Sequence, residues 1–331
     1  MEQEAREAPL RIRNQLSENR RMMMALGEKI RLFDPKYVIT VGRGTSDHAG
    51  VFAKYLIEVE LGLAVSSAAP SVTSIYNRTM QLDDALILFI SQSGRSPDIL
   101  AQAEMAKRAG AFCIALVNDE TAPIGDIADA VIPLRAGQEN AVAATKSYLA
   151  TLSALLQLVA YWSGDETMIV ALDDLPIQLS EMTHAPAQIL PKSFTTLENC
   201  VVLGRGFGYA ISLEIALKLK EVCSIHAEAF SSAEFFHGPV TLVNNKLTVL
   251  DISIADEAAT IHREMMDEIH RRGAIILPMS AAKVDIMKFV HPRFAPLLIL
   301  QKFYLDVEKI ALSLGVNPDA PVGLCKVTKT V

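Results

Sequence analysis

The stretch Tyr37-Val-Ile-Thr-Val41-Gly42-Arg43-Gly44-Thr45-Ser46 decides the fold of this chain. Five residues typical of a strand lead into a glycine-rich turn, and a helix-length segment follows the turn as far as Gly62. The same pattern occurs again where Cys200–Leu203 precedes Gly204-Arg205-Gly206, offset by about half of the 331 residues. A recurrence of strand, turn and helix at half-length predicts two copies of one α/β module.

Further apolar runs of strand length alternate with helix-length segments in both halves. The first half has Leu86–Ile90, Phe112–Val117 and Ala130–Leu134, and the second has Leu247–Ile252 and Ala274–Pro278. Continuous apolar strands that alternate with helices indicate a parallel sheet covered on both faces. We therefore expect an α/β protein with two tandem modules, each a doubly wound parallel sheet flanked by helices.

The chain divides into four parts on this interpretation. We expect an N-terminal helical segment, two modules that meet in the polar stretch near Ser163–Leu175, and a tail from which Pro318 and Pro321 exclude a helix. Long helices are expected over Pro97–Ala109, Ala143–Trp162 and Phe294–Leu314. The predicted parts are residues 1–30, 31–170, 171–315 and 316–331.

Composition narrows the class of protein. Half of the residues are hydrophobic and 21% are charged, so the chain can bury large cores and is not disordered. The formal charge of −7 argues against a nucleic-acid partner, because phosphate binding needs a concentrated basic surface. The apolar runs are too short to span a bilayer, and Met1–Gln15 lacks the apolar core of a secretion signal. We therefore expect a cytoplasmic protein with no membrane partner.

The residues that commonly bind metals and nucleotides form no recognised motif. The histidines and cysteines share no metal-ligand spacing, and the four cysteines are expected to be reduced thiols (Cys113, Cys200, Cys223 and Cys325). Asp47 stands where a dinucleotide-binding turn has its third glycine, and neither half contains a P-loop. The sequence thus predicts no metal and no cofactor.

Hydroxyl-rich loops follow two strands of the first module. Thr45 and Ser46 come after the first strand, and Ser91-Gln92-Ser93-Gly94-x-Ser96 comes after Leu86–Ile90. Ligands bind at the carboxyl ends of strands in doubly wound sheets, where helix N-termini present free N–H groups to anions. We interpret these loops as a cradle for a small monophosphate. The alternative is that the hydroxyls only cap their helices.

Charged residues interrupt an otherwise apolar helix in the second module. Glu214, Lys218 and Glu221 lie at positions i, i+4 and i+7 of one stripe. A solvated, salt-bridged face is one explanation. The other is a partly buried glutamate held beside a lysine as a general base. His237 precedes Gly238-Pro239 and is therefore expected on an accessible turn, where its imidazole can transfer protons near neutral pH.

These motifs together resemble the sugar isomerase (SIS) domain family. The first half matches in its Gly44-Thr45-Ser46, Ser91-Gln92-Ser93-Gly94 and Ala143-Ala-Thr-Lys146 segments. The second half, through Leu213–Glu221 and Glu234–Pro239, is similar to the isomerase module of glucosamine-6-phosphate synthase. The resemblance extends in collinear order over essentially the whole chain.

The resemblance implies a role for each candidate site residue. Glu221 would be the base that moves a proton between C1 and C2, and Lys326 would contact the open-chain carbonyl end. His237 would open the sugar ring and would come from the neighbouring subunit of a homodimer. The phosphate and the sugar would contact the remaining candidates, which are Thr45, Ser46, Ser91, Gln92, Ser93, Ser96, Val142, Ala143 and Lys218.

The resemblance also implies a reaction. The synthase carries an N-terminal glutaminase domain, whereas this sequence starts with the isomerase-like portion, as do the SIS-type glucosamine-6-phosphate deaminases. We therefore expect glucosamine 6-phosphate and water to give fructose 6-phosphate and ammonia. Ala144 in place of a serine, and Arg95-Ser96 in place of an acidic residue and threonine, leave the sugar open. The alternatives are a deglycase or deaminase of a fructosamine or galactosamine phosphate, and a non-catalytic sugar-phosphate sensor.

Overall fold

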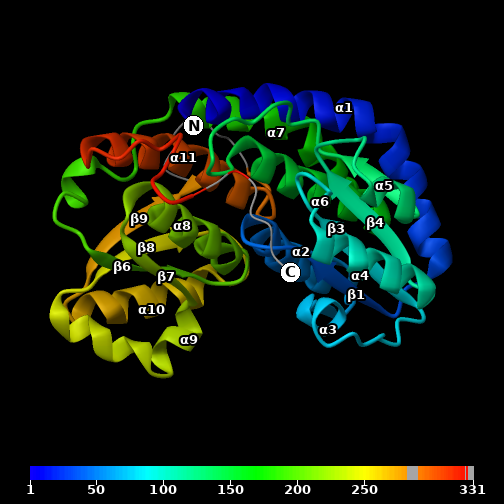
Figure 1. Cartoon of the computed structure of the whole chain (residues 1–331). Helices are drawn as coiled ribbons and strands as arrows, with labels where there is room; N and C mark the ends of the chain where they lie inside the picture. Colours follow the sequence, from blue (N-terminus) through cyan, green and yellow to red (C-terminus); the bar gives the residue numbers. More distant parts are fainter. Residues whose placement is uncertain (282–289, 325, 327–331) are drawn as a thin grey trace. The chain divides into compact units, whose positions relative to one another are not determined.

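The chain folds into two compact units, each built on its own parallel sheet (Figure 1). The computed structural model describes residues 1–281, 290–324 and 326. The first-sheet unit contains Ala8–Glu139 and Lys146–Pro176. The second-sheet unit contains Met1–Glu7, Asn140–Thr145 and the described residues of Ile177–Lys326. The expected α/β class with two parallel sheets is confirmed.

The first sheet has the strand order β2-β1-β3-β4-β5, and all four neighbouring pairs are parallel. Every residue of β3 and β4 is buried, as expected for strands with a helix layer on each face. The strands are β1 (Tyr37–Val41), β2 (Val65–Ser67), β3 (Ala85–Ile90), β4 (Phe112–Val117) and β5 (Ala130–Pro133).

Helices enclose this sheet. One set is α2 (Thr45–Leu61), which packs against β1 and β2 and against α6 (Lys146–Ser163). Another set is α4 (Pro97–Arg108), which packs against β3 and β4 with α3 (Ser71–Ser74) and α5 (Ile124–Ile127) beside it. The expected helix over Ala143–Trp162 starts later, at Lys146, so Ala143 lies in a loop.

The N-terminal helix α1 (Glu2–Phe33) is anchored by buried amide side chains. Gln15 donates from Nε2 to the carbonyl oxygens of Leu134 and Ala150, both at 2.8 Å. In return, Gln157 of α6 donates to the carbonyl oxygen of Leu16 at 2.8 Å. These bonds give the buried amide N–H groups of Gln15 and Gln157 hydrogen-bond acceptors on backbone carbonyls.

The second sheet has the order β7-β6-β8-β9 and is also parallel throughout. On it lie α8 (Phe207–Cys223), which packs against α11 (Ala295–Ser313), and α9 (Ser232–Phe236), which packs against α10 (Ala259–Arg271). Short 3-10 turns occupy Pro191–Ser193 and Pro239–Asn245. The strands are β6 (Asn199–Gly204), β7 (His226–Ser231), β8 (Thr248–Ser253) and β9 (Ile275–Ser280).

The two copies share the geometry of their turns. Gly44 has φ 54° and ψ −126°, and Gly206 has φ 55° and ψ −122°. Residues other than glycine rarely adopt this region. Register agrees as well, since Val41 pairs with Phe89 in the first sheet and Leu203 pairs with Asp251 in the second. The predicted internal repeat is therefore present in the backbone.

The stretch expected to hold the boundary between modules is mostly helical. After a turn at Gly164 (φ 74°), helix α7 runs from Glu166 to His184. Asp165 begins it by accepting backbone N–H bonds from Thr167 and Met168. The chain passes from the first-sheet unit to the second inside α7, after Pro176.

The tail and the cysteines agree with expectation where they are described. Residues 316–324 and 326 contain no helix. Cys113, Cys200 and Cys223 are buried free thiols, and burial raises the pKa of each to about 12. Cys325 and residues 327–331 lie outside the described residues. In the described part of the chain, the helices are too short or too polar to cross a membrane.

Candidate functional site

The predicted phosphate cradle lies at the carboxyl edge of the first sheet. β1 pairs with β2 on one side and with β3 on the other, so the loops after β1 and β3 diverge at the switch point where doubly wound sheets bind ligands. Thr45 and Ser46 form the start of α2 after β1, and Ser91–Ser96 connects β3 to α4. The cradle residues are thus gathered in one unit, as predicted.

Helix capping does not account for the hydroxyls of these loops. The N-cap of α2 is Gly44, and the N-cap of α4 is Ser96, whose hydroxyl makes no capping bond to the described helix. Ser91 has a local role, because its Oγ accepts the backbone N–H of Gly94 at 3.1 Å. Ser93 and Gln92 are only half-buried. This arrangement favours the cradle interpretation over capping alone.

Arg43 is a residue that the sequence interpretation missed. Its Nε and Nη2 both lie 3.0 Å from Oδ2 of Asp98, a carboxylate with a fully buried side chain in the first turn of α4. The other oxygen of Asp98 accepts the backbone N–H of Ile99. The pair fixes a half-exposed guanidinium beside the cradle, and the signal for it was Arg43 lying between two glycines of the turn.

Arg95, which lies in the loop that carries the cradle serines, is paired with a carboxylate. Its guanidinium lies 2.8 Å from Asp119 Oδ2 and also donates to Thr121. Hydrogen bonds from Thr121 and Arg95 lower the pKa of Asp119 to about 2. Asp119 is therefore ionised at neutral pH and offsets the positive charge of Arg95.

The charged stripe of α8 is a buried ion network. Lys218 is 1% exposed, and its Nζ lies 3.1 Å from Glu214 Oε1 and 2.6 Å from Glu221 Oε2. Glu214 is fully buried, whereas Glu221 is 22% exposed. The explanation as a solvated face is therefore wrong for this stripe. One carboxylate is buried and the other is partly exposed to solvent.

The network keeps Lys218 positively charged. Burial by itself would lower the pKa of Lys218, but the charges of Glu214 and Glu221 and their hydrogen bonds outweigh burial and raise that pKa above its ordinary value. Tyr304 of α11 adds a hydroxyl, which donates to Glu214 Oε1 at 3.4 Å. Glu221 thus shares one cation with a second carboxylate, an arrangement suited to a general base.

The other predicted site residues of the second-sheet unit fall into two places. His237 is exposed on the turn between α9 and the 3-10 segment, as expected. Lys326 donates from Nζ to the carbonyl oxygen of Ala141 at 2.6 Å, next to Val142 and Ala143. A second bond holds the loop, because the backbone N–H of Val142 donates to the backbone carbonyl oxygen of Asp319 at 3.0 Å. Lys326 and the Val142–Ala143 loop therefore form one group.

Comparison with known proteins assigns the fold. The model of the SIS domain family matches residues 31–161 and 194–287. The chain belongs to the SIS domain family. Both sheets fall within the matched segments, so the two SIS segments correspond to the two copies of the repeat.

Relatives with a similar SIS portion are larger proteins. Glutamine–fructose-6-phosphate aminotransferase (isomerizing) of Bradyrhizobium diazoefficiens is 31% identical over 86% of this chain and 50% of its own length. The enzyme of the same name from Aquifex aeolicus is 31% identical over 89% of this chain and 52% of its own length. The chain spans about half the length of these relatives.

Solved structures extend the similarity over nearly the whole chain. A protein provisionally described as a phosphosugar isomerase, from Silicibacter pomeroyi DSS-3, has a TM-score of 0.89 and 36% identity, covering 96% of this chain and 99% of its own. The C-terminal domain of glucosamine-fructose-6-phosphate aminotransferase from Francisella tularensis has a TM-score of 0.81 and 25% identity, and the match covers 96% of this chain and 97% of that domain. Glucosamine-6-phosphate deaminase from Thermotoga maritima has a TM-score of 0.71 and 19% identity, and the match covers 97% of this chain and 100% of its own. At this level of identity the comparison shows a shared fold alone.

The buried network predicts a pH-dependent loss of stability in Lys218→Met. Without this cation Glu214 is a buried carboxylate that lacks its ion-pair partner, so the free energy of unfolding should fall by about 3–5 kcal/mol at pH 8. The folded-state pKa of Glu214 then lies above its unfolded value, so protonation relieves the loss as the pH falls toward 5. Urea unfolding at pH 5 and pH 8 measures the effect.

Lys220→Met is the matched control, because Lys220 is exposed on the same helix. Equal stability of the two variants at pH 8 would contradict the assignment of Lys218 as the cation that neutralises Glu214.

Proposed function

We propose that this protein is a cytoplasmic amino-sugar-phosphate deaminase that converts glucosamine 6-phosphate and water to fructose 6-phosphate and ammonia. The observation that carries the proposal is the network on α8, which leaves Glu221 partly exposed beside a buried ammonium. A base of this kind suits proton transfer between adjacent carbons of a sugar. In this proposal the hydroxyl loops of the first-sheet unit bind the phosphate.

The proposed reaction has three stages. His237 transfers the proton that opens the sugar ring, which leaves an aldehyde at C1 and an amine at C2. Glu221 then removes the proton from C2 and returns one to C1, so that C2 becomes an imine. Water adds to the imine carbon and ammonia leaves, which gives the ketone of fructose 6-phosphate. Lys326 would hold the carbonyl end in this scheme, and Val142 and Ala143 would contact the sugar.

We propose the direction of deamination because of the substrates that each direction consumes. Aminotransferases of the same family need glutamine as a nitrogen donor, whereas deamination needs only the sugar phosphate and water. The proposed roles of Glu221, His237 and Lys326 suffice for that chemistry. Retention of all three also favours an enzyme over a sensor, because a sensor needs only the phosphate cradle.

A substrate panel tests the proposed activity. The protein is incubated with glucosamine, galactosamine and fructosamine 6-phosphates, and ammonia and ketose phosphate are measured; fructose 6-phosphate with glutamine is a separate arm. Ammonia release from glucosamine 6-phosphate is expected. Release from another amino sugar alone would favour the second candidate, which Ala144 in place of a serine supports. Amino-sugar formation from glutamine, or binding without turnover, would overturn the deaminase.

The role of Glu221 predicts a specific loss of proton transfer. Glu221→Gln keeps the shape of the side chain but cannot accept a proton, so kcat should fall by about 10²–10⁴, the usual contribution of a positioned base. Solvent-deuterium incorporation into fructose 6-phosphate isolates this step from ammonia release. Glu228→Gln, which changes an exposed glutamate on β7, is the control. Label exchange at the parental rate in Glu221→Gln would mean that another group is the base.

The cradle predicts an effect on affinity. Ser93→Ala removes one proposed hydrogen bond to the phosphate, a bond to a charged group worth about 1.5–3 kcal/mol, so KM should rise roughly ten- to hundred-fold. The fall in kcat should be much smaller, because the phosphate does not take part in the proton transfer. Ser66→Ala, an exposed serine of β2, serves as the comparison. Unchanged affinity of Ser93→Ala for fructose 6-phosphate would remove Ser93 from the cradle.

The proposed site also requires a homodimer in which His237 serves the partner's substrate. Protomers carrying Glu221→Gln and protomers carrying His237→Ala should each be inactive, yet some mixed dimers contain one complete site. Mixing the two variants should therefore restore part of the parental activity. No recovery after subunit exchange, verified with differently tagged protomers, would show that His237 does not act across an interface.

A further inference from the structure

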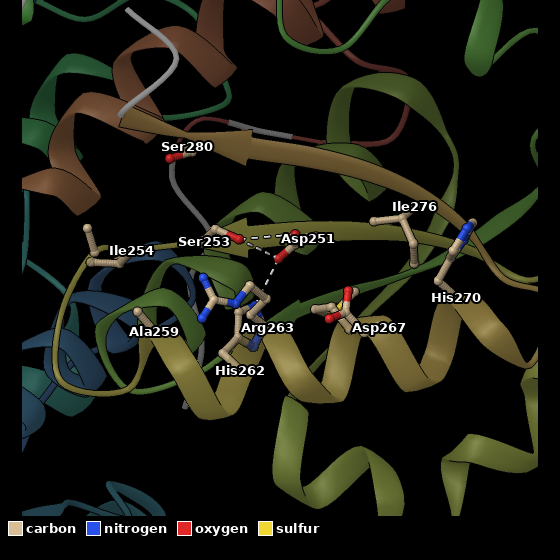
Figure 2. A pocket seen from close by; sticks show the side chains of 12 residues that line it. Asp251, Ser253, Ile254, Ala259, His262, Arg263, Asp267, His270, Ile276 and Ser280 are labelled. Carbon is tan, nitrogen blue, oxygen red and sulfur yellow. Dashed lines mark hydrogen bonds and ion pairs between the residues drawn. The ribbon is translucent and has the colours of Figure 1, made fainter.

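A hollow of about 440 Å³ lies within the second-sheet unit, between α10 and the strands β8 and β9 (Figure 2). None of its lining residues is among those assigned to the proposed reaction. Small-molecule sites usually have volumes of roughly 300–1,000 Å³. The hollow is therefore large enough for a monosaccharide derivative.

A buried polar pair lies at the base of this hollow. Oδ1 of Asp251, on β8, lies 2.8 Å from Nε2 of His262 (Figure 2). The hydroxyl of Ser253 donates to the same carboxylate, at 2.9 Å from Oδ1 and 3.0 Å from Oδ2. An ionised carboxylate only accepts hydrogen bonds, so Nε2 of His262 carries the proton. His262 is 4% exposed, and its Nδ1 has no hydrogen-bond partner among the described residues. A buried nitrogen of this kind calls for a partner.

The fold itself does not require this pair. Asp251 pairs with Leu203 near the end of β6, and Phe89 pairs with the equivalent Val41 at the end of β1. Phe89 therefore occupies in the first sheet the position that Asp251 has in the second. In the first copy, Phe89 and Ile99 of α4 belong to one apolar cluster, whereas α10 turns His262 towards β8. The second sheet thus has a carboxylate paired with an imidazole at a strand position where the first sheet has an apolar side chain, which indicates a role other than packing.

Charged side chains line the side of the hollow formed by α10. Arg263 and Asp267 are exposed, and the described residues provide no ion-pair partner for either. Figure 2 shows both on the helix that carries His262, with Asp267 one turn further along. Hydroxyls face them, since Ser253 and Ser280 also line the hollow. A ligand that fits these groups carries a negative charge, a positive charge and several hydroxyls.

We propose that this hollow is a second small-molecule site, for a hydroxyl-rich zwitterion of the amino-sugar phosphate class. Arg263 pairs with the phosphate, Asp267 pairs with the ammonium, and a hydroxyl or N–H of the ligand satisfies Nδ1 of His262. The site takes no part in the proposed deamination, and its existence does not depend on that reaction.

A methyl signal inside the hollow provides the test. Met266 lines the hollow and is 6% exposed, so protein labelled with ¹³C-methyl methionine reports on ligand there, with the signal assigned from Met266→Leu. Glu221→Gln protein, which should not turn over substrate, is titrated with glucosamine 6-phosphate. The Met266 signal should move and saturate. Glucose 6-phosphate, which lacks the ammonium, should bind at least about ten-fold more weakly by the same signal.

Variants of the charged residues separate this site from the cradle. Arg263→Gln and Asp267→Asn should each weaken the Met266 response about ten-fold or more, whereas Glu264→Gln, an exposed residue of α10 outside the hollow, should not. Ser93→Ala should leave this response unchanged. A Met266 signal that does not move, or a response lost in Ser93→Ala and kept in both α10 variants, would overturn the second site. Absence of turnover in the substrate panel would instead count against the deaminase alone.

Discussion

Each sheet depends on a backbone turn that only glycine adopts without strain. Gly44 and Gly206 have φ values of 54° and 55° and ψ values near −125°. The turn follows β1 in the first sheet and β6 in the second, and it starts a helix against the sheet. Gly42 and Gly204 precede it, and a Cβ on either would lie 2.7 or 2.3 Å from backbone atoms of that helix. The close approach of helix to strand brings the loops of the carboxyl edge within reach of a ligand.

The two copies built on this turn have specialised in different chemistry. In the first copy the loop after β3 carries Ser91, Gln92 and Ser93, and a guanidinium is held beside it by a buried carboxylate. In the second copy β8 ends with Ser253 and the loop continues Ile254-Ala255-Asp256, which offers an anion fewer side-chain donors. The charge of the second copy lies instead on α8, and in the pair of Asp251 and His262. One backbone plan thus carries hydroxyl-rich loops in one copy and buried ionisable groups in the other.

The ion network of α8 shows how burial turns a charged motif into a reactive one. A lysine with one exposed carboxylate would be a surface ion pair of little consequence. Enclosing Lys218 and Glu214 between α8 and α11 ties the lysine to a second carboxylate and leaves Glu221 at the open end. Removal of Lys218 would leave the buried carboxylate of Glu214 without this cation in a region of low dielectric, so the pair is strongly held.

Strand and helix positions could be predicted from the sequence because their signals are local. The run Phe112–Val117 is apolar throughout, and a strand buried on both faces accepts no other pattern. β7 was missed because His226-Ala-Glu228 alternates exposed and buried residues at the edge of the sheet. Helix α7 was not foreseen from the sequence, because Ser163-Gly164-Asp165 is a break of one turn and a helix starts immediately after it.

The sequence by itself determined the repeat, the family, the hydroxyl loops and the charged stripe, because each is a short pattern set by backbone geometry or helical spacing. Only the tertiary structure decided that Glu214 is sealed while Glu221 is open, that Asp98 holds Arg43, and that Asp251 meets His262. Those facts depend on which elements pack together, and burial and ion pairing between distant segments are properties of packing that no local pattern encodes.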